Sequence, residues 1–212
     1  MSTDWLSMPS SPPIIGEPAW DIARFYPLQG GWSESDYLSI ALTQNWMVEY
    51  TDGCIEVLPM PTLAHQLIVR FLLDALRAFV DPKNLGMVLF APLPVKTVPK
   101  SYREPDLIFN FAENHVKRGH EYYEGADLVM EVVSDDRRSH ERDYDKNRED
   151  YAEAKIPEYW IVNPQAQRVT VLALDGSQYV EHGVFAAGTL ATSRLLNGFS
   201  VNVDAIFAAA RQ

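Results

Sequence analysis

The sequence predicts an α/β domain preceded by a proline-rich N-terminal arm. Its 212 residues suit one domain of ordinary composition, and apolar segments of strand length are interspersed with longer segments of helical periodicity. Asp52-Gly53 and Asp175-Gly176 each separate two strand-like segments, a strong signal for a β-hairpin. Prolines interrupt residues 1–31. We therefore place the arm at residues 1–31 and the domain at residues 32–212.

The first half of the domain should contain two helices and a hairpin. Serine and acidic residues from Ser33 onward favour a short capped helix over residues 33–42. The first hairpin would pair residues 47–51 with residues 54–58. Thr62 then opens a longer helix, which should end near Asp81-Pro82 because a proline disfavours helix in the residue before it.

The second half contains most of the predicted strands. Apolar segments indicate strands over residues 87–90, 95–98, 106–111, 128–133 and 157–164. A charged helix is expected over residues 137–155, a second hairpin pairs residues 169–174 with residues 178–182, and a helix over residues 204–210 ends the chain.

Charge and composition narrow the possible locations and partners. The net charge is −11, whereas proteins that hold nucleic acid through its phosphates usually carry a basic patch. A nucleic-acid partner is thus possible but is not supported by net charge. No apolar run is long enough to span a membrane, and no signal peptide is visible. The single cysteine, Cys54, fits a reducing cytoplasm, so we expect a cytoplasmic protein without membrane contact.

Two carboxylates lie in apolar strands. Asp106 begins one segment, and Glu131 lies in the middle of Leu128–Ser134. A buried unpaired carboxylate costs several kcal/mol. If the two strands were neighbours, about 5 Å apart, both carboxylates could hold one divalent cation, Mg²⁺ or Mn²⁺ rather than zinc. Equally, Asp106 could cap its strand while Glu131 pairs with an arginine inside the fold. Spacing alone leaves both interpretations open.

A resemblance to a known family rests on these residues and on others in order along the chain. Pro105-Asp106, followed by Glu131 in a hydrophobic strand, looks like the PD-(D/E)xK nuclease pattern. The wider set resembles the bacterial Uma-type family of restriction-endonuclease-like proteins, a domain of unknown function, over roughly residues 33–207. The resemblance implies a restriction-endonuclease-like core, a mixed β-sheet flanked by helices, with added β-hairpins. The additional matching positions are Asp52-Gly53, His65, Val132-Val133-Ser134, Arg142-Asp143, Tyr151 and residues 156–164.

The resemblance also implies a metal site. Asp106 and Glu131 match the metal-binding carboxylates of the superfamily, and the main-chain carbonyl of Val132 would be the third protein ligand of Mg²⁺ or Mn²⁺. His65, in the first turn of the long helix, would assist a water or phosphate, or else only orient the helix end. Glu49 could add a carboxylate to the site, or else lie on the outer face of the hairpin.

The catalytic lysine is where this chain departs from the pattern. The superfamily's usual position for it holds Val133, and the family's substitute position, four residues before Tyr151, holds Asn147. Lys146 is one residue away, about 100° around a helix, and its long side chain could still reach the site. We assign Lys146 the role of neutralising charge on the reacting phosphate.

Two functions follow from these observations. The first is a metal-dependent nuclease, expected to be a homodimer, in which Asp106, Glu131, Lys146 and His65 are catalytic and Mg²⁺ activates the attacking water. The second is a non-catalytic interaction protein that retains the nuclease fold. The carboxylate pair favours the nuclease, while Asn147 and the acidic charge favour the interaction protein.

Overall fold

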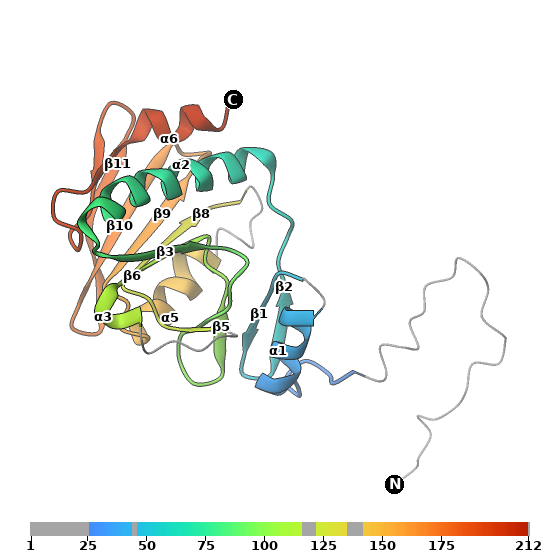
Figure 1. The fold of residues 1–212 in the computed structure, drawn as a ribbon. Helices are drawn as coiled ribbons and strands as arrows, with labels where there is room; N and C mark the ends of the chain where they lie inside the picture. The colour runs from blue at the N-terminus through green and yellow to red at the C-terminus, as the bar shows by residue number, and fades with distance from the viewer. Residues whose placement is uncertain (1–25, 44–45, 116–121, 135–141, 212) are drawn as a thin grey trace, which may run out of the picture.

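A six-stranded mixed sheet is the centre of the structure, a computed structural model that describes residues 26–43, 46–115, 122–134 and 142–211 (Figure 1). Its strand order is β11-β10-β9-β8-β6-β3. The β8–β9 pair is parallel and the other neighbours are antiparallel. The strands are β3 (Gly86–Phe90), β6 (Leu107–Phe111), β8 (Leu128–Val132), β9 (Glu158–Asn163), β10 (Arg168–Asp175) and β11 (Gln178–Ala186).

Helices cover both faces of this sheet, as Figure 1 shows. On one face, α2 (Leu63–Val80) and α6 (Val203–Ala209) pack over a core that includes Met130 and Trp160. On the other face lie the π-helical segment η4 (Arg142–Lys146) and α5 (Asn147–Glu153). The residues of β8 alternate between the two cores, Met130 in the first and Val129 in the second. This strand is therefore buried on both sides.

A smaller five-stranded sheet stands beside the first, in the order β2-β1-β5-β4-β7. Helix α1 (Glu34–Thr43) packs against it through a cluster of Tyr37, Tyr50 and Tyr102. The strands are β1 (Val48–Thr51), β2 (Cys54–Val57), β4 (Val95–Lys96), β5 (Ser101–Arg103) and β7 (Tyr123–Glu124). The remaining elements are η3 (Asp81–Lys83), α3 (Ala112–His115) and the paired strands β12 (Leu190–Thr192) and β13 (Ser200–Asn202).

Most predicted elements are confirmed close to their expected bounds. In the first hairpin, Asp52 and Gly53 have positive φ angles of 44° and 80°, as a two-residue turn of this kind requires. Helix α2 begins after Thr62, whose hydroxyl accepts a hydrogen bond from His65 N at 3.2 Å. The predicted mixed α/β architecture, a mixed sheet flanked by helices, is therefore correct.

Several details differ from expectation. Strand β11 runs to Ala186 rather than to residue 182, and the short elements η3, α3, β7, β12 and β13 were not predicted. The second hairpin turns one residue later than predicted, because Asp175 still pairs with Gln178. Strand β4 ends at Lys96, and the three-residue strand β5 was not predicted, being too short to show a period. The charged helix ends at Glu153, and its predicted residues 137–141 lie outside the described residues.

The predicted arm lies almost wholly outside the described part of the chain, which begins at residue 26. Its last residues contact the first hairpin. Gly30 N donates to Gly53 O at 2.8 Å, and the Gln29 side-chain amide exchanges two hydrogen bonds with the backbone of Ile55. Among the helices that the structure describes, none combines the length and the apolar character that crossing a membrane would need.

Candidate functional site

Asp106 and Glu131 lie side by side at one end of the paired strands β6 and β8. The register sets Leu107 opposite Met130, which brings the preceding Asp106 next to Glu131. Asp106 N donates to Glu131 Oε2 at 3.2 Å, and Val132 N donates to Asp106 Oδ2 at 2.7 Å. Only 8% and 7% of their surfaces are exposed. Two carboxylates are thus held together at a position that solvent scarcely reaches.

The partners of these carboxylates bear on the two interpretations that spacing left open. Glu131 Oε1 accepts hydrogen bonds from the Tyr151 hydroxyl at 2.8 Å and from Asn147 Nδ2 at 3.3 Å. No arginine pairs with Glu131 within the described ranges. Among the described residues, Glu131 is thus held by hydrogen bonds from a tyrosine and an asparagine and not by an ion pair with an arginine. Burial first, and then the charges of Asp106 and Asp143, raise the pKa of the Glu131 carboxyl above its usual range.

His65 faces Asp106 from the first turn of α2. Its Nε2 lies 3.1 Å from Asp106 Oδ2. Burial lowers the pKa of the imidazole, but the hydrogen bond and charge of Asp106 outweigh burial, and the main chain of Val132 acts in the same direction, so the pKa lies above its ordinary value. The Thr62 cap fixes the helix end from which His65 projects. The structure thus brings His65, Asp106, Glu131 and the main chain of Val132 together.

Asp143 is a third acidic residue here, and sequence reasoning noted it only as a position that matches the family. It is 2% exposed, and its Oδ1 accepts from Arg142 Nε at 3.3 Å and from Asn147 Nδ2 at 3.4 Å. Burial raises the pKa of Asp143 to about 7, with Arg142 opposing the shift and Asp106 and Glu49 adding to it. Because Asp143 and Asn147 are four residues apart, their shared helix face was the signal that could have placed it.

The side chains of Asn147 and Lys146 point in different directions at this site. Asn147 is fully buried, and its amide nitrogen lies between the carboxylates of Glu131 and Asp143. Lys146 is exposed and lines a neighbouring groove instead. One step along the chain therefore turns the side chain from the carboxylates toward the groove.

Glu49 is also buried, at 2% exposure, so its alternative placement on the outer face of the hairpin is wrong. Arg103 Nη1 donates to Glu49 Oε2 at 3.2 Å, and Arg103 Nη2 pairs with Asp150 of α5. This buried ion-pair network joins the small sheet to the helix that carries Asn147. Its glutamate is already neutralised, unlike Glu131.

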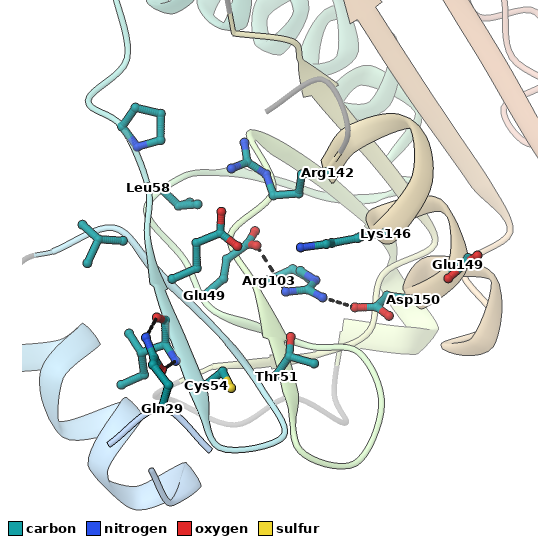
Figure 2. Close-up of a pocket in the computed structure, with 14 residues that line it drawn as sticks. Gln29, Glu49, Thr51, Cys54, Leu58, Arg103, Arg142, Lys146, Glu149 and Asp150 are labelled. Atoms are coloured by element: carbon teal, nitrogen blue, oxygen red, sulfur yellow. Dashed lines mark hydrogen bonds and ion pairs between the residues drawn. The ribbon is translucent and has the colours of Figure 1, made fainter. Parts of the chain in front are cut away.

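Two neighbouring hollows lie beside these groups. A small cavity of about 30 Å³ is lined by Asp106, Glu131 and His65, together with Val132, Ser134, Arg142 and Asp143 among others. A groove of about 930 Å³ lies alongside and shares Glu49, Leu58, Pro59 and Arg142 with it. Figure 2 shows Lys146 extending into this groove, between Arg142 and Arg103 and toward Glu49.

The donor atoms of the small cavity fit a hard divalent cation. Asp106 and Glu131 provide carboxylate oxygens, the ligands that Mg²⁺ and Mn²⁺ prefer, and their mutual repulsion would fall on binding a cation. Within the ranges that the structure describes, no three histidine, cysteine or acidic side chains converge as a complete metal site. A bound cation would therefore depend on two carboxylates, a main-chain carbonyl and water.

Glu104, two residues before Asp106, gives a test of these buried charges. It is 5% exposed, and its Oε2 has no partner among the described residues. Burial raises the pKa of Glu104 to about 8, against an opposing hydrogen bond from the Val48 backbone. The unfolded pKa is about 4.3. Between these values the folded protein binds more protons than the unfolded chain, so stability falls as pH rises.

We therefore expect Glu104→Gln to stabilise the protein increasingly from pH 5 to pH 8.5. At pH 8.5 the gain in free energy of unfolding should reach at least about 1 kcal/mol, well short of the full shift because the amide is itself buried. Melting curves across this range test the prediction, with exposed Glu153→Gln as the control. If the Glu104→Gln and parent curves stay parallel, Glu104 is ionised without penalty and the prediction is wrong.

Comparisons with known proteins identify the family and the fold. The family model of Uma2, described as "Putative restriction endonuclease", matches residues 34–204. Among solved structures, a putative nuclease belonging to DUF820 from Anabaena variabilis is similar, with a TM-score of 0.69 and 18% identity over 87% of this chain and 99% of that one. At this identity the likeness shows the fold, which is restriction-endonuclease-like. No curated protein matches.

Proposed function

This chain belongs to the Uma2 family of putative restriction endonucleases, and we propose that it is a divalent-cation-dependent nuclease that hydrolyses phosphodiester bonds. The observation that carries the proposal is the Asp106–Glu131 pair, buried at a cavity without an arginine to neutralise Glu131 in the described chain. Natural proteins rarely retain such a pair unless a ligand uses it.

Asp106, Glu131 and the carbonyl of Val132 would hold Mg²⁺ or Mn²⁺. When bound, such a cation supplies a water of lowered pKa and offsets charge on a phosphoryl oxygen. Tyr151 and Asn147 are positioning residues, since their hydrogen bonds fix Glu131 Oε1. His65 orients Asp106 through Oδ2 and can bond to a water or phosphate near it. Lys146 supplies positive charge in the adjoining groove.

The second candidate is a non-catalytic interaction protein. Asn147 favours it, because this buried amide occupies the family's lysine position and provides no charge. The net charge of −11 favours it as well. In this reading the carboxylate pair is a relic of an ancestral site.

A cleavage assay distinguishes the two functions. The purified protein is incubated with single-stranded DNA, duplex DNA and RNA, each with Mg²⁺, Mn²⁺ or EDTA. We expect cation-dependent cleavage of at least one substrate, and a loss on the order of 100-fold or more in Asp106→Ala, because even residues behind metal ligands contribute 10–100-fold. Exposed Asp145→Ala is the matched control. Cleavage of no substrate by the parent protein, or equal cleavage by Asp106→Ala, would leave the interaction protein as the better proposal.

Our proposal extends to location and assembly. A cytoplasmic location is supported by the use of a single cysteine, Cys54. A homodimer is suggested by the proline-rich arm, which has the composition of a segment ordered by a partner subunit. Sedimentation of the protein with and without residues 1–25 tests whether the protein is a homodimer and whether the arm is needed for dimerisation.

A further inference from the structure

Three positively charged side chains line the groove beside the carboxylates: Arg103, Arg142 and Lys146. Arg103 is not available to a ligand, because its two terminal amino groups pair with Glu49 and Asp150 and its side chain is only 6% exposed. Arg142 and Lys146 are the cations of this groove that remain for a ligand. Their positions relative to the carboxylates differ.

Arg142 borders both hollows. It lines the groove and also the small cavity of Asp106, Glu131 and His65, whereas Lys146 lines the groove alone. The two residues are the first and last of η4, about one helical turn apart. Along the wall of the groove, therefore, one cation lies at the carboxylates and the other lies farther out.

We propose that Arg142, rather than Lys146, contacts the phosphate that is cleaved, and that Lys146 contacts a neighbouring phosphate of the same strand. This inference rests on the proposed nuclease function and deepens it. It assigns the charge of the missing superfamily lysine to an arginine on a different turn of the helix.

The contacts of Arg142 fit this role. Its Nε donates to Asp143 Oδ1 at 3.3 Å, and its terminal amino groups pair with none of the residues that the structure describes. Asp143 is itself held by Asn147 Nδ2. Asp143 thus holds the Nε edge of the guanidinium, and no acceptor among the described residues occupies the two terminal amino groups, which we assign to the incoming phosphate. Arginine binds phosphate oxygens through two parallel hydrogen bonds, which fixes direction as well as charge.

The acidic surroundings of the cavity explain why a positively charged side chain must lie close to the reacting phosphate. Glu49, Glu131 and Asp143 all act on Arg142 electrostatically, so a phosphate that approaches the mouth of this small cavity meets several acidic residues. A guanidinium that borders the cavity offsets that repulsion where charge grows during hydrolysis. An exposed lysine ammonium in the outer groove acts mainly on binding, since solvent screens its effect at the carboxylates.

The test separates catalysis from binding in four variants: Arg142→Gln, Arg142→Lys, Lys146→Gln and the control Arg148→Gln. Arg148 lies in α5, directly after η4, outside the groove, and donates to Tyr179 O. Cleavage of a labelled oligonucleotide with Mn²⁺ gives kcat and KM. Fluorescence anisotropy in EDTA gives the affinity as salt concentration rises. Melting temperatures show which variants are folded.

We expect Arg142→Gln to lower kcat on the order of 100-fold with a smaller rise in KM than Lys146→Gln causes, and Arg142→Lys to recover part of kcat. Lys146→Gln should instead raise KM and reduce the salt slope of binding by about one phosphate contact. Arg148→Gln should resemble the parent. Unchanged kcat in folded Arg142→Gln, or a loss of kcat in Lys146→Gln, overturns the assignment.

The inference and the proposed function can fail separately. If the parent cleaves and Lys146 controls kcat, the nuclease proposal stands and the assignment to Arg142 is wrong. If the parent does not cleave but Arg142→Gln and Lys146→Gln each weaken oligonucleotide binding and its salt slope, the phosphate contacts are supported without catalysis. If the parent neither cleaves nor binds any oligonucleotide, both are overturned.

Discussion

Mn²⁺ is expected to raise the melting temperature of this protein and to leave that of Glu131→Gln unchanged. In the absence of metal, Asp106 and Glu131 repel each other in a buried position, so a cation that binds only the folded state stabilises it by mass action. At a concentration 100 times the dissociation constant, the gain is about 2.7 kcal/mol, or roughly 5–10 °C for a chain of this size.

Differential scanning fluorimetry over a Mn²⁺ titration measures this effect. Asp106→Asn provides a second variant that should lose the shift, and Glu113→Gln, an exposed glutamate on the same protein, should keep it. Glu131→Gln retains an oxygen that can accept from Tyr151, so a loss of response there reports on the ligand charge and not on the hydrogen bond. An equal rise in all variants would place the cation elsewhere.

The central pair could be predicted because local pattern and topology agree. Apolar residues on both sides of Glu131 predict a strand buried on two faces, and the pairing of β6 with β8 fulfils that pattern. The Thr62 cap likewise fixed the start of α2 and hence the position of His65. In each case a few consecutive residues determine the local element, although the pairing of β6 with β8 that brings Asp106 to Glu131 is a contact that spacing alone did not establish.

The surroundings of the pair could not be predicted in the same way. Arg103 connects Glu49 and Asp150, which are far from it in sequence, through a three-residue strand that carries no visible period. Arg142 reaches the cavity from a π-helical turn, whereas the sequence drew attention to Lys146 because it is the lysine nearest to the family's position. The sequence could not identify Asp143 as the third acidic residue or Arg142 as the positively charged side chain of the cavity, because both assignments depend on these tertiary details.

Asn147→Lys is expected to increase cation-dependent cleavage about tenfold. The amide of Asn147 lies 3.3 Å from Glu131 Oε1 and 3.4 Å from Asp143 Oδ1, so a lysine at this position would enter the carboxylate cluster directly. A charge-assisted contact is about twice as strong as a neutral one, and positive charge here favours a transition state of growing negative charge. Overpacking should lower stability by about 1–3 kcal/mol.

Asn147→Met is the matched control, since methionine has a long unbranched side chain without charge. It should share the loss of stability and show no gain in cleavage. We also expect Lys146→Ala to lower cleavage by raising KM, as its position in the outer groove implies.

If the parent cleaves well and Asn147→Lys adds nothing, Arg142 already supplies sufficient charge. If the parent is inactive and Asn147→Lys is also inactive while Mn²⁺ still binds, the missing lysine is not the cause. The interaction function then gains support, because the metal site would be intact without hydrolysis.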